Sequence, residues 1–278
     1  MNSWSSNKLL QRSAAHIVLI IAALFFAAPL LFMISISVKP NSELFDWPPK
    51  LIPGAFEWRN YTDALEYIPF FSYLWNTVKV ALLATAGILF SCPMVAYSMA
   101  RFQWRGSKLL FALTLGVMML PFQVTMIPIF IFFKEIGWVD TYLPLWVPAF
   151  FGSPFLIFLL TQFFRGLPKE LEDAARIDGA NELLIYLRIM LPLCRPALLT
   201  VALFQFMGSW SDYIGPLIYL SDDTKYTVML GLAAFRTQHG VEWQMLMATS
   251  MMVTVPIIVL YFFVQKSFIR GITFSGIK

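Results

Sequence analysis

The sequence predicts an all-α polytopic membrane protein with six transmembrane helices, because apolar residues dominate it and its charges are widely separated. Of the 278 residues, 59% are apolar and 13% are charged, whereas about 25% of the residues in an average soluble domain are charged. Uncharged stretches of about 20 residues match the helix length that crosses a bilayer core. This composition argues against a soluble enzyme, a nucleic-acid binder, a disulfide-stapled secreted domain and a disordered chain.

The uncharged stretches define the six predicted spans, which lie within 13–38, 75–100, 108–133, 142–164, 196–220 and 243–265. The first stretch is longer than the roughly 7–15 apolar residues of a signal-peptide core, so we expect it to be retained as a span. Several spans contain prolines, namely Pro29, Pro121, Pro128, Pro144, Pro148, Pro154, Pro216 and Pro256. Such prolines are tolerated where neighbouring helices or cavities satisfy the freed carbonyls, which favours a bundle around an internal path. Ordinary kinks without a function remain the alternative.

The distribution of basic residues predicts the orientation. Six spans place both termini on one side, and the loops on that side carry 13 Lys and Arg residues against 6 on the opposite side. Basic residues near span ends favour the cytoplasm, so we expect both termini to be cytoplasmic. On the opposite side, segment 39–74 is rich in proline, tryptophan and tyrosine. We expect it to be an irregular excursion at the outer surface of the membrane.

The chain lacks the residue sets of the common catalytic and metal sites. Its two cysteines, Cys92 and Cys194, form neither a metal set nor a disulfide framework, and two histidines, His16 and His239, add no ligand cluster. The sequence contains no Walker-type phosphate loop, no H-E-x-x-H and no G-x-S-x-G. No basic run interleaved with aromatic residues indicates nucleic acid. We therefore expect no metal, no cofactor bound by this chain and no enzymatic activity.

The longest predicted cytoplasmic loop carries the densest polarity. Pro168 and the acidic residues after it suit the first turn of a helix of about 11 residues. Gly179 suits its C-terminal stop, Asn181 can cap a second helix, and Pro192 is expected to close that helix. Such short helices cannot span a bilayer. From the residues alone, a surface connector and a docking element for another protein both remain open.

This loop carries a resemblance to a known family. Asp173-Ala174-Ala175, followed by Gly179 and by Ile189-Met190-Leu191-Pro192, resembles the EAA motif of ABC-importer permeases, E-A-A-x3-G-x9-I-x-L-P. Asp173 stands where the motif has Glu, which keeps the charge.

The wider sequence is similar to the carbohydrate-uptake branch of these permeases, the maltose-type family of binding-protein-dependent inner membrane components. Trp210-Ser211-Asp212 with Pro216-Leu217 resembles the W-N-D and P-L signature of that branch, with Ser211 where Asn is usual. The stretch from Pro121 to Pro128 resembles its third-span sequence, and the resemblance covers roughly 12–278.

The resemblance implies a type I ABC-importer permease fold, with one permease domain over 1–278 and a coupling segment, 166–192, between spans four and five. It implies a multi-pass protein of the bacterial cytoplasmic membrane. Its implied partners are membrane lipid, a second homologous permease, two ATPase subunits that use ATP and Mg²⁺, and an extracytoplasmic solute-binding protein. The residues implied to dock on the ATPase are Glu172, Asp173, Ala174, Ala175, Arg176, Asp178 and Gly179. The tail 271–278 resembles family tails that reach toward the ATPase.

The predicted solute path centres on Asp212, because an ionisable residue within a span is a functional candidate by default. A carboxylate beside aromatic rings suits a sugar, and the full candidate set is Gln123, Gln205, Ser209, Trp210, Asp212 and Tyr213. An interfacial aromatic belt with a structural Asp212 remains equally open. For Lys79 we favour a side chain that snorkels to the membrane surface.

The expected function is therefore half of the solute path of an ATP-driven importer for a sugar or oligosaccharide. One alternative is a permease for glycerol phosphate or another small polar solute, although few fixed cations are available to bind a phosphate. A more remote alternative is an ATP-independent channel or secondary transporter.

Overall fold

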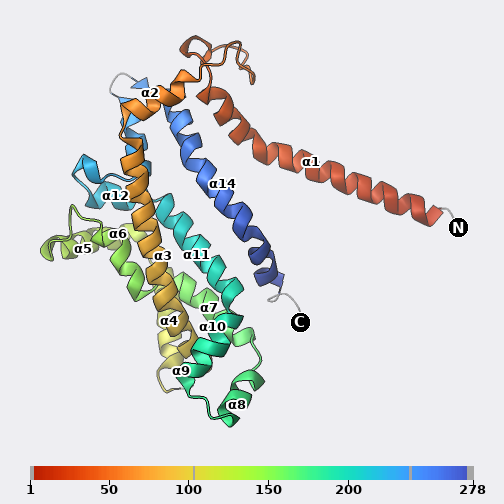
Figure 1. The fold of residues 1–278 in the computed structure, drawn as a ribbon, viewed down its shortest axis with the longest axis vertical. Helices are drawn as coiled ribbons and strands as arrows, with labels where there is room; N and C mark the ends of the chain where they lie inside the picture. The colour runs from red at the N-terminus through yellow and green to blue at the C-terminus, as the bar shows by residue number, and fades with distance from the viewer. Residues whose placement is uncertain (1–2, 103, 238–239, 274–278) are drawn as a thin grey trace. The chain divides into compact units, whose positions relative to one another are not determined.

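The computed structural model describes residues 3–102, 104–237 and 240–273. The described chain forms two compact units. The first contains the residues up to Pro69 together with Leu232–Val255, and the second contains Phe70–Gly231 together with the residues from Pro256 onward. Figure 1 shows the helical character of both units. Each unit is described separately.

The first unit contains the first predicted span and most of the segment that follows it. Its elements are α1 (Ser3–Ser37), the 3-10 helix η1 (Asn41–Glu43), α2 (Arg59–Tyr67), the 3-10 helix η5 (Leu232–Phe235), the antiparallel strands β1 (Arg236–Thr237) and β2 (Gly240–Val241), and the beginning of α14 (Trp243–Thr273). The stretches Arg12–Ser37 and Trp243–Phe263 are each long and apolar enough to cross a membrane. The first and sixth predicted spans are therefore confirmed as helices, and Pro29 and Pro256 lie inside them without ending them.

The excursion after α1 folds back onto the end of that helix. Asn60 donates from Nδ2 to the carbonyls of Ser37 and Lys39, at 3.1 and 2.9 Å, and Glu57 N–H donates to Val38 O at 2.8 Å. Apart from η1, the predicted irregular structure is observed up to Trp58, but α2 was not predicted. The aromatic residues of the excursion, Phe45, Trp47, Phe56 and Trp58, are exposed.

The second unit is built around α3, which begins and ends at Phe70 and Arg101. The other elements of the unit are α4 (Ser107–Met118), α5 (Phe122–Glu135), α6 (Leu143–Trp146), the 3-10 helix η2 (Val147–Phe151), α7 (Pro154–Gly166), α8 (Glu170–Ile177), α9 (Glu182–Ile185), the π-helix η3 (Tyr186–Met190), α10 (Leu191–Leu193), α11 (Arg195–Trp210), α12 (Ile214–Tyr219), the 3-10 helix η4 (Asp223–Lys225) and α13 (Val228–Gly231). α3 packs along η2, α7 and α11 (Figure 1). It confirms the second predicted span, and the packed core of the unit includes Ile88, Leu160 and Val201.

The third predicted span is not one straight helix. α4 and α5 meet at an angle of 100°. Pro121 precedes α5 in an extended conformation, with ψ of 139°. Since proline lacks an N–H group and its ring clashes with the preceding turn, it ends the helical ladder here. Pro128 lies inside α5 and does not end it.

The fourth and fifth predicted spans are also segmented. Leu143–Gly166 is long and apolar enough to cross a membrane, but Gly152, at φ 93°, separates η2 from α7. α11 ends at Trp210, so the predicted range 196–220 joins α11 and α12 across a break. The helical run Glu182–Leu193 meets α11 at 75°. In the described part of the chain, four stretches qualify as single spans and six qualify if each bent pair counts as one.

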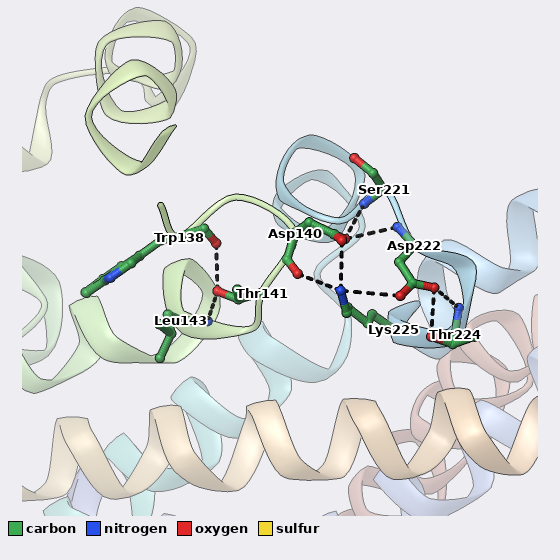
Figure 2. Close-up of polar contacts among 8 residues, drawn as sticks. All are labelled: Trp138, Asp140, Thr141, Leu143, Ser221, Asp222, Thr224 and Lys225. Atoms are coloured by element: carbon green, nitrogen blue, oxygen red, sulfur yellow. Dashed lines mark hydrogen bonds and ion pairs between the residues drawn. The ribbon is translucent and has the colours of Figure 1, made fainter. Parts of the chain in front are cut away.

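A cluster of polar contacts joins two loops of the second unit (Figure 2). Asp140 Oδ1 accepts hydrogen bonds from the backbone N–H groups of Ser221 and Asp222, both at 3.0 Å, and Lys225 Nζ lies 2.8 Å from Asp140 Oδ2. Lys225 Nζ also lies 3.3 Å from Asp222 Oδ2. Asp140 adopts φ 62°, a left-handed conformation that Asp and Asn tolerate better than most residues. The cluster therefore fixes the loop before α6 to the loop after α12.

Substitutions at Asp140 should distinguish the stabilisation due to its charge from the stabilisation due to its loop contacts and its tolerance of positive φ. The Lys225 ammonium and the two N–H groups lower the pKa of Asp140 to about 2. The stabilisation should be complete above the ordinary value of 3.8 and lost as the pH falls through about 2. Asp140→Asn should lower the melting temperature of the detergent-solubilised chain equally at pH 5 and pH 7. Asp140→Ala should lower it further, because it also loses the loop contacts and the tolerance for positive φ.

Asp223→Asn is the charge-matched control for this experiment, because Lys225 pairs with Asp140 and Asp222 in the described structure. The control should leave the melting temperature close to that of the parent. If Asp140→Ala had the melting temperature of the parent, the cluster would not be what holds the two loops together.

Candidate functional site

The predicted coupling segment forms a short helix that ends in a tight turn. The acidic residues in the first turn of α8 favour its start, because the positive end of the helix dipole lies there. Gly179 adopts φ 80°, and the N–H groups of Gly179 and Ala180 donate to Arg176 O and Ala175 O at 3.0 and 2.9 Å. The predicted turn at Gly179 is confirmed.

The length predicted for this helix is wrong. α8 has 8 residues rather than about 11, and its N-cap is Lys169, so Pro168 precedes the helix instead of beginning it.

The helix after the turn differs from the prediction at its end. Asn181 Oδ1 accepts the Leu184 N–H at 2.9 Å, so the predicted N-cap is confirmed. Pro192 does not close the helix, which continues to Leu193 through a π turn over Tyr186–Met190. In this turn Leu191 N–H donates to Tyr186 O, five residues back. The wider π turn changes the regular pairing of backbone N–H and C=O groups, which a proline would otherwise interrupt.

One face of α8 is buried against the rest of its unit. Glu172 Oε1 lies 2.6 Å from Arg101 Nε, and each of the two side chains is only 3% exposed. Glu172 Oε2 also lies 3.5 Å from an Arg176 guanidinium nitrogen, and Ala175 is buried in the core. Burial raises the pKa of the Glu172 carboxyl, and the two guanidinium groups oppose that rise. Of the predicted docking residues, Glu172 and Ala175 are thus buried against their own chain.

The opposite face of α8 is exposed and carries most of the predicted docking residues. Asp173, Ala174, Asp178 and Gly179 are exposed. Arg176 is exposed too, and its guanidinium lies 2.9 Å from Asp173 Oδ1 and 2.8 Å from Glu182 Oε1. The hydrogen bond from Arg176 lowers the pKa of Glu182. This face therefore presents small residues next to an ordered charged rim.

The sequence analysis missed exposed apolar residues at this end of the unit. Ile177, in the last turn of α8, is 87% exposed, and Leu183 and Leu187 in the next helical run are 65% and 50% exposed. Leu183 and Leu187 are four residues apart, which places them on one helix face. The sequence signal that could have indicated this exposed surface is Ile177, an isoleucine among charged residues at the end of a helix. Together these side chains give the segment an apolar surface that suits a protein partner.

Of the predicted solute-path residues, Asp212 lies at a cavity. The cavity has a volume of about 840 Å³ and lies within the second unit, between α5, α6, η2 and α12. Aromatic and aliphatic residues dominate its lining, which consists of Phe122, Ile129, Phe132, Phe133, Ile136, Trp138, Pro144, Leu145, Val147, Pro148, Phe151, Asp212, Ile214, Gly215 and Tyr219. Asp212 Oδ1 accepts the Gly215 N–H at 3.0 Å. The carboxylate therefore also caps the start of α12.

The other five candidates are not in the lining of this cavity. Gln205 donates from Nε2 to Ser209 Oγ at 3.0 Å along α11, and Trp210 is buried with its ring 5.5 Å from that of Phe206. Gln123 is exposed and Tyr213 is partly buried. Sequence reasoning missed the aromatic lining residues of α5 and η2, because their convergence with α12 depends on the breaks in spans three to five.

Two further expectations concern Lys79 and the tail. Lys79 Nζ lies 5.1 Å from the centre of the Tyr142 ring, a cation–π geometry. The end of the tail, 274–278, lies outside the described residues, as does His239. Among the described residues, no group of three or more His, Cys, Asp or Glu side chains is placed to hold a metal ion.

Alanine at position 215 should disturb the Asp212 cap. A Cβ atom there would overlap Asp212 Oδ2 and lie 3.1 Å from Leu145 Cδ2. We expect Gly215→Ala to reduce the free energy of unfolding by about 0.5–2 kcal/mol, the usual cost of losing a cap. Gly208→Ala in α11 is the control, since no atom lies within 4 Å of its added Cβ. The control should be neutral or stabilising, and the same result for Gly215→Ala would show that Asp212 does not need this glycine.

The helices, their breaks and the short two-faced helix α8 define a membrane permease of the ABC-importer type. The fold is similar to that of a chain from a bacterial ABC transporter involved in the import of the acidic polysaccharide alginate, with a TM-score of 0.79 and 24% sequence identity. The match covers 94% of this chain and 97% of that chain. The predicted type I permease fold is confirmed, with six spans in the described residues when each bent pair counts as one.

The chain belongs to the family described as "Binding-protein-dependent transport system inner membrane component", whose sequence profile matches residues 93–274. It is 37% identical over 257 residues to the arabinooligosaccharides transport system permease protein AraQ of Halalkalibacterium halodurans, covering 90% of each chain. It is 31% identical to the trehalose/maltose transport system permease protein MalG of Thermococcus litoralis, covering 95% of this chain and 97% of that protein. The resemblance found in the sequence is therefore confirmed, and the chain is a multi-pass transport permease.

Proposed function

We propose that the chain is one of two permease subunits of an ATP-driven importer for a sugar or oligosaccharide, and that it docks on an ATPase through α8. The observation that carries the docking proposal is the division of α8 into a buried face, held by Arg101, and an exposed face that ends at the Gly179 turn. The carbohydrate part rests on relatives whose names specify arabinooligosaccharides and trehalose/maltose transport.

The proposed assembly contains this chain, a second homologous permease, two ATPase subunits and an extracytoplasmic solute-binding protein. The ATPase subunits use ATP and Mg²⁺, while this chain is non-catalytic and binds neither. The excess of Lys and Arg on the α8 side supports a cytoplasmic location for α8 and for both termini in the bacterial inner membrane. The cavity beside Asp212 lacks Lys and Arg in its lining, which favours a neutral solute over a phosphate-bearing one.

Variants of Gly179 test the docking turn. No atom lies within 4 Å of a Cβ added at this glycine, so a side chain would meet only the strain of φ 80°. We expect Gly179→Val to impair ATP-driven uptake of arabinotriose by the complete importer in proteoliposomes, because L-residues in this conformation cost about 1–2 kcal/mol. Gly179→Asn should retain most of the uptake, since Asn tolerates left-handed φ. Full uptake with Gly179→Val would contradict the docking role of the turn.

Ile177 tests the exposed face independently of the turn. Burial of an exposed isoleucine contributes about 1.5–3 kcal/mol, so Ile177→Ser should weaken ATPase binding by about tenfold or more. The measurement is the dissociation constant of the purified ATPase for the permease pair in nanodiscs. Ile52→Ser removes a similarly exposed isoleucine, 74% exposed in the first unit, and should leave that constant unchanged. Equal affinities for the parent and Ile177→Ser would exclude Ile177 from the docking surface.

A further inference from the structure

Arg101 ends the longest helix of the second unit at the point where three elements meet. Its side chain leaves the last residue of α3, a helix of 32 residues. One guanidinium nitrogen donates to Leu167 O, at the C-cap of α7, at 2.8 Å, and Nε lies 2.6 Å from Glu172 Oε1 on α8. A single side chain thus connects α3, α7 and α8.

The chain segments on either side of α8 are non-helical, so the orientation of α8 depends on its side-chain contacts. Residues 167–169 join it to α7, and 178–181 join it to α9. Apart from the polar anchor at Glu172, its inner face offers Ala175 for core packing. An apolar contact through one methyl group holds α8 in place only weakly, whereas the Arg101 guanidinium adds an ion pair at 2.6 Å to α8 and a hydrogen bond at 2.8 Å to the end of α7.

Stability alone gives a poor reason for this ion pair. Replacing a buried pair with apolar residues of similar size is often neutral or stabilising, because both charges must be desolvated. The connection that the pair makes between α3 and α8 is therefore its more important property.

α3 also makes close contacts near its other end. Asn76 donates from Nδ2 to Thr224 O and Tyr226 O, both at 3.0 Å, and Thr77 Oγ1 accepts the Val228 N–H at 2.9 Å. Asn76 and Arg101 are 25 positions apart, which corresponds to about 38 Å of helix. α3 continues through Pro93, so one helix connects Arg101 to the loop that carries Lys225.

We propose that Arg101 is a positioning residue that ties α8 to α3 through Glu172, so that the two helices move as one body when the ATPase displaces α8. This inference rests on the proposed function. It adds the route by which motion of the docking helix enters the membrane-spanning part of the chain.

The experiment measures the distance between α3 and α8 in the complete importer. Spin labels are attached to Met94→Cys on α3 and Glu170→Cys on α8, both exposed positions. The native Cys92 and Cys194 are fully buried, which directs labelling to the introduced thiols. Double electron–electron resonance is recorded in nanodiscs without nucleotide and after trapping with ATP and vanadate. In the parent, the distance should change by less than about 2 Å, the size of ordinary helix shifts at interfaces.

The critical variant is Arg101→Met/Glu172→Met, which removes both charges and leaves neither one buried alone. It should keep the parent's melting temperature within a few degrees and still co-purify with the ATPase. Its α3–α8 distance should shift by more than about 2 Å or broaden on trapping. Arg101→Lys, which cannot reach both partners with the same geometry, should show the same change to a smaller extent. Asp63→Asn is the matched control, because it breaks an exposed ion pair with Arg59 that involves neither α3 nor α8, and it should behave like the parent.

The outcomes separate this inference from the proposed function. If the distance stays narrow and unchanged in the Met/Met and Lys variants, or changes in the parent, the inference is overturned while docking stands. Loss of ATPase co-purification in the Met/Met variant alone would also overturn it, in favour of a role in folding α8. If the parent itself neither binds an ATPase nor traps nucleotide, the proposed function is overturned and the inference falls with it.

Discussion

A backbone N–H or C=O group within a bilayer has no water to bond, and each break in a membrane helix therefore needs a partner within the protein. This chain meets that requirement at several breaks. Asp212 caps the start of α12, Ser91 Oγ donates to Ala149 O in η2 at 3.0 Å, and Leu191 N–H reaches five residues back in the π turn. Short polar side chains thus supply the partner at the start of α12 and at η2, whereas the π turn is satisfied by backbone atoms alone.

α8 is small and is still well placed within its unit. An eight-residue helix is marginal by itself, because helix nucleation is unfavourable and few hydrogen bonds repay it. α8 is stabilised instead by its ends and by one face: acidic residues in the first turn, a left-handed glycine after the last turn, and the buried pair with Arg101. The buried pair with Arg101 lies on the inner face, so the exposed face remains free to present Ala174 and Ile177.

Sequence reasoning predicted the features that depend on local chemistry. Uncharged stretches located α1, α3 and α14, and the turn at Gly179 and the cap at Asn181 followed from the known preferences of those residues. The features it missed depend on contacts between distant segments. Glu172 was expected to face a partner, but its burial depends on Arg101, 71 residues earlier in the chain. The 100° bend between α4 and α5 likewise could not be read from Pro121 alone, because Pro128 in the same stretch causes no break.

The surroundings of Gly179 determine what kind of residue this position accepts. No atom lies within 4 Å of a Cβ added at Gly179, and φ is 80°. The position therefore restricts the backbone conformation of the residue and not the size of its side chain. A D-amino acid prefers the mirror-image conformation, so D-alanine would fit at this turn while L-alanine would strain it. Glycine is thus the genetically encoded residue that adopts this left-handed backbone conformation most readily.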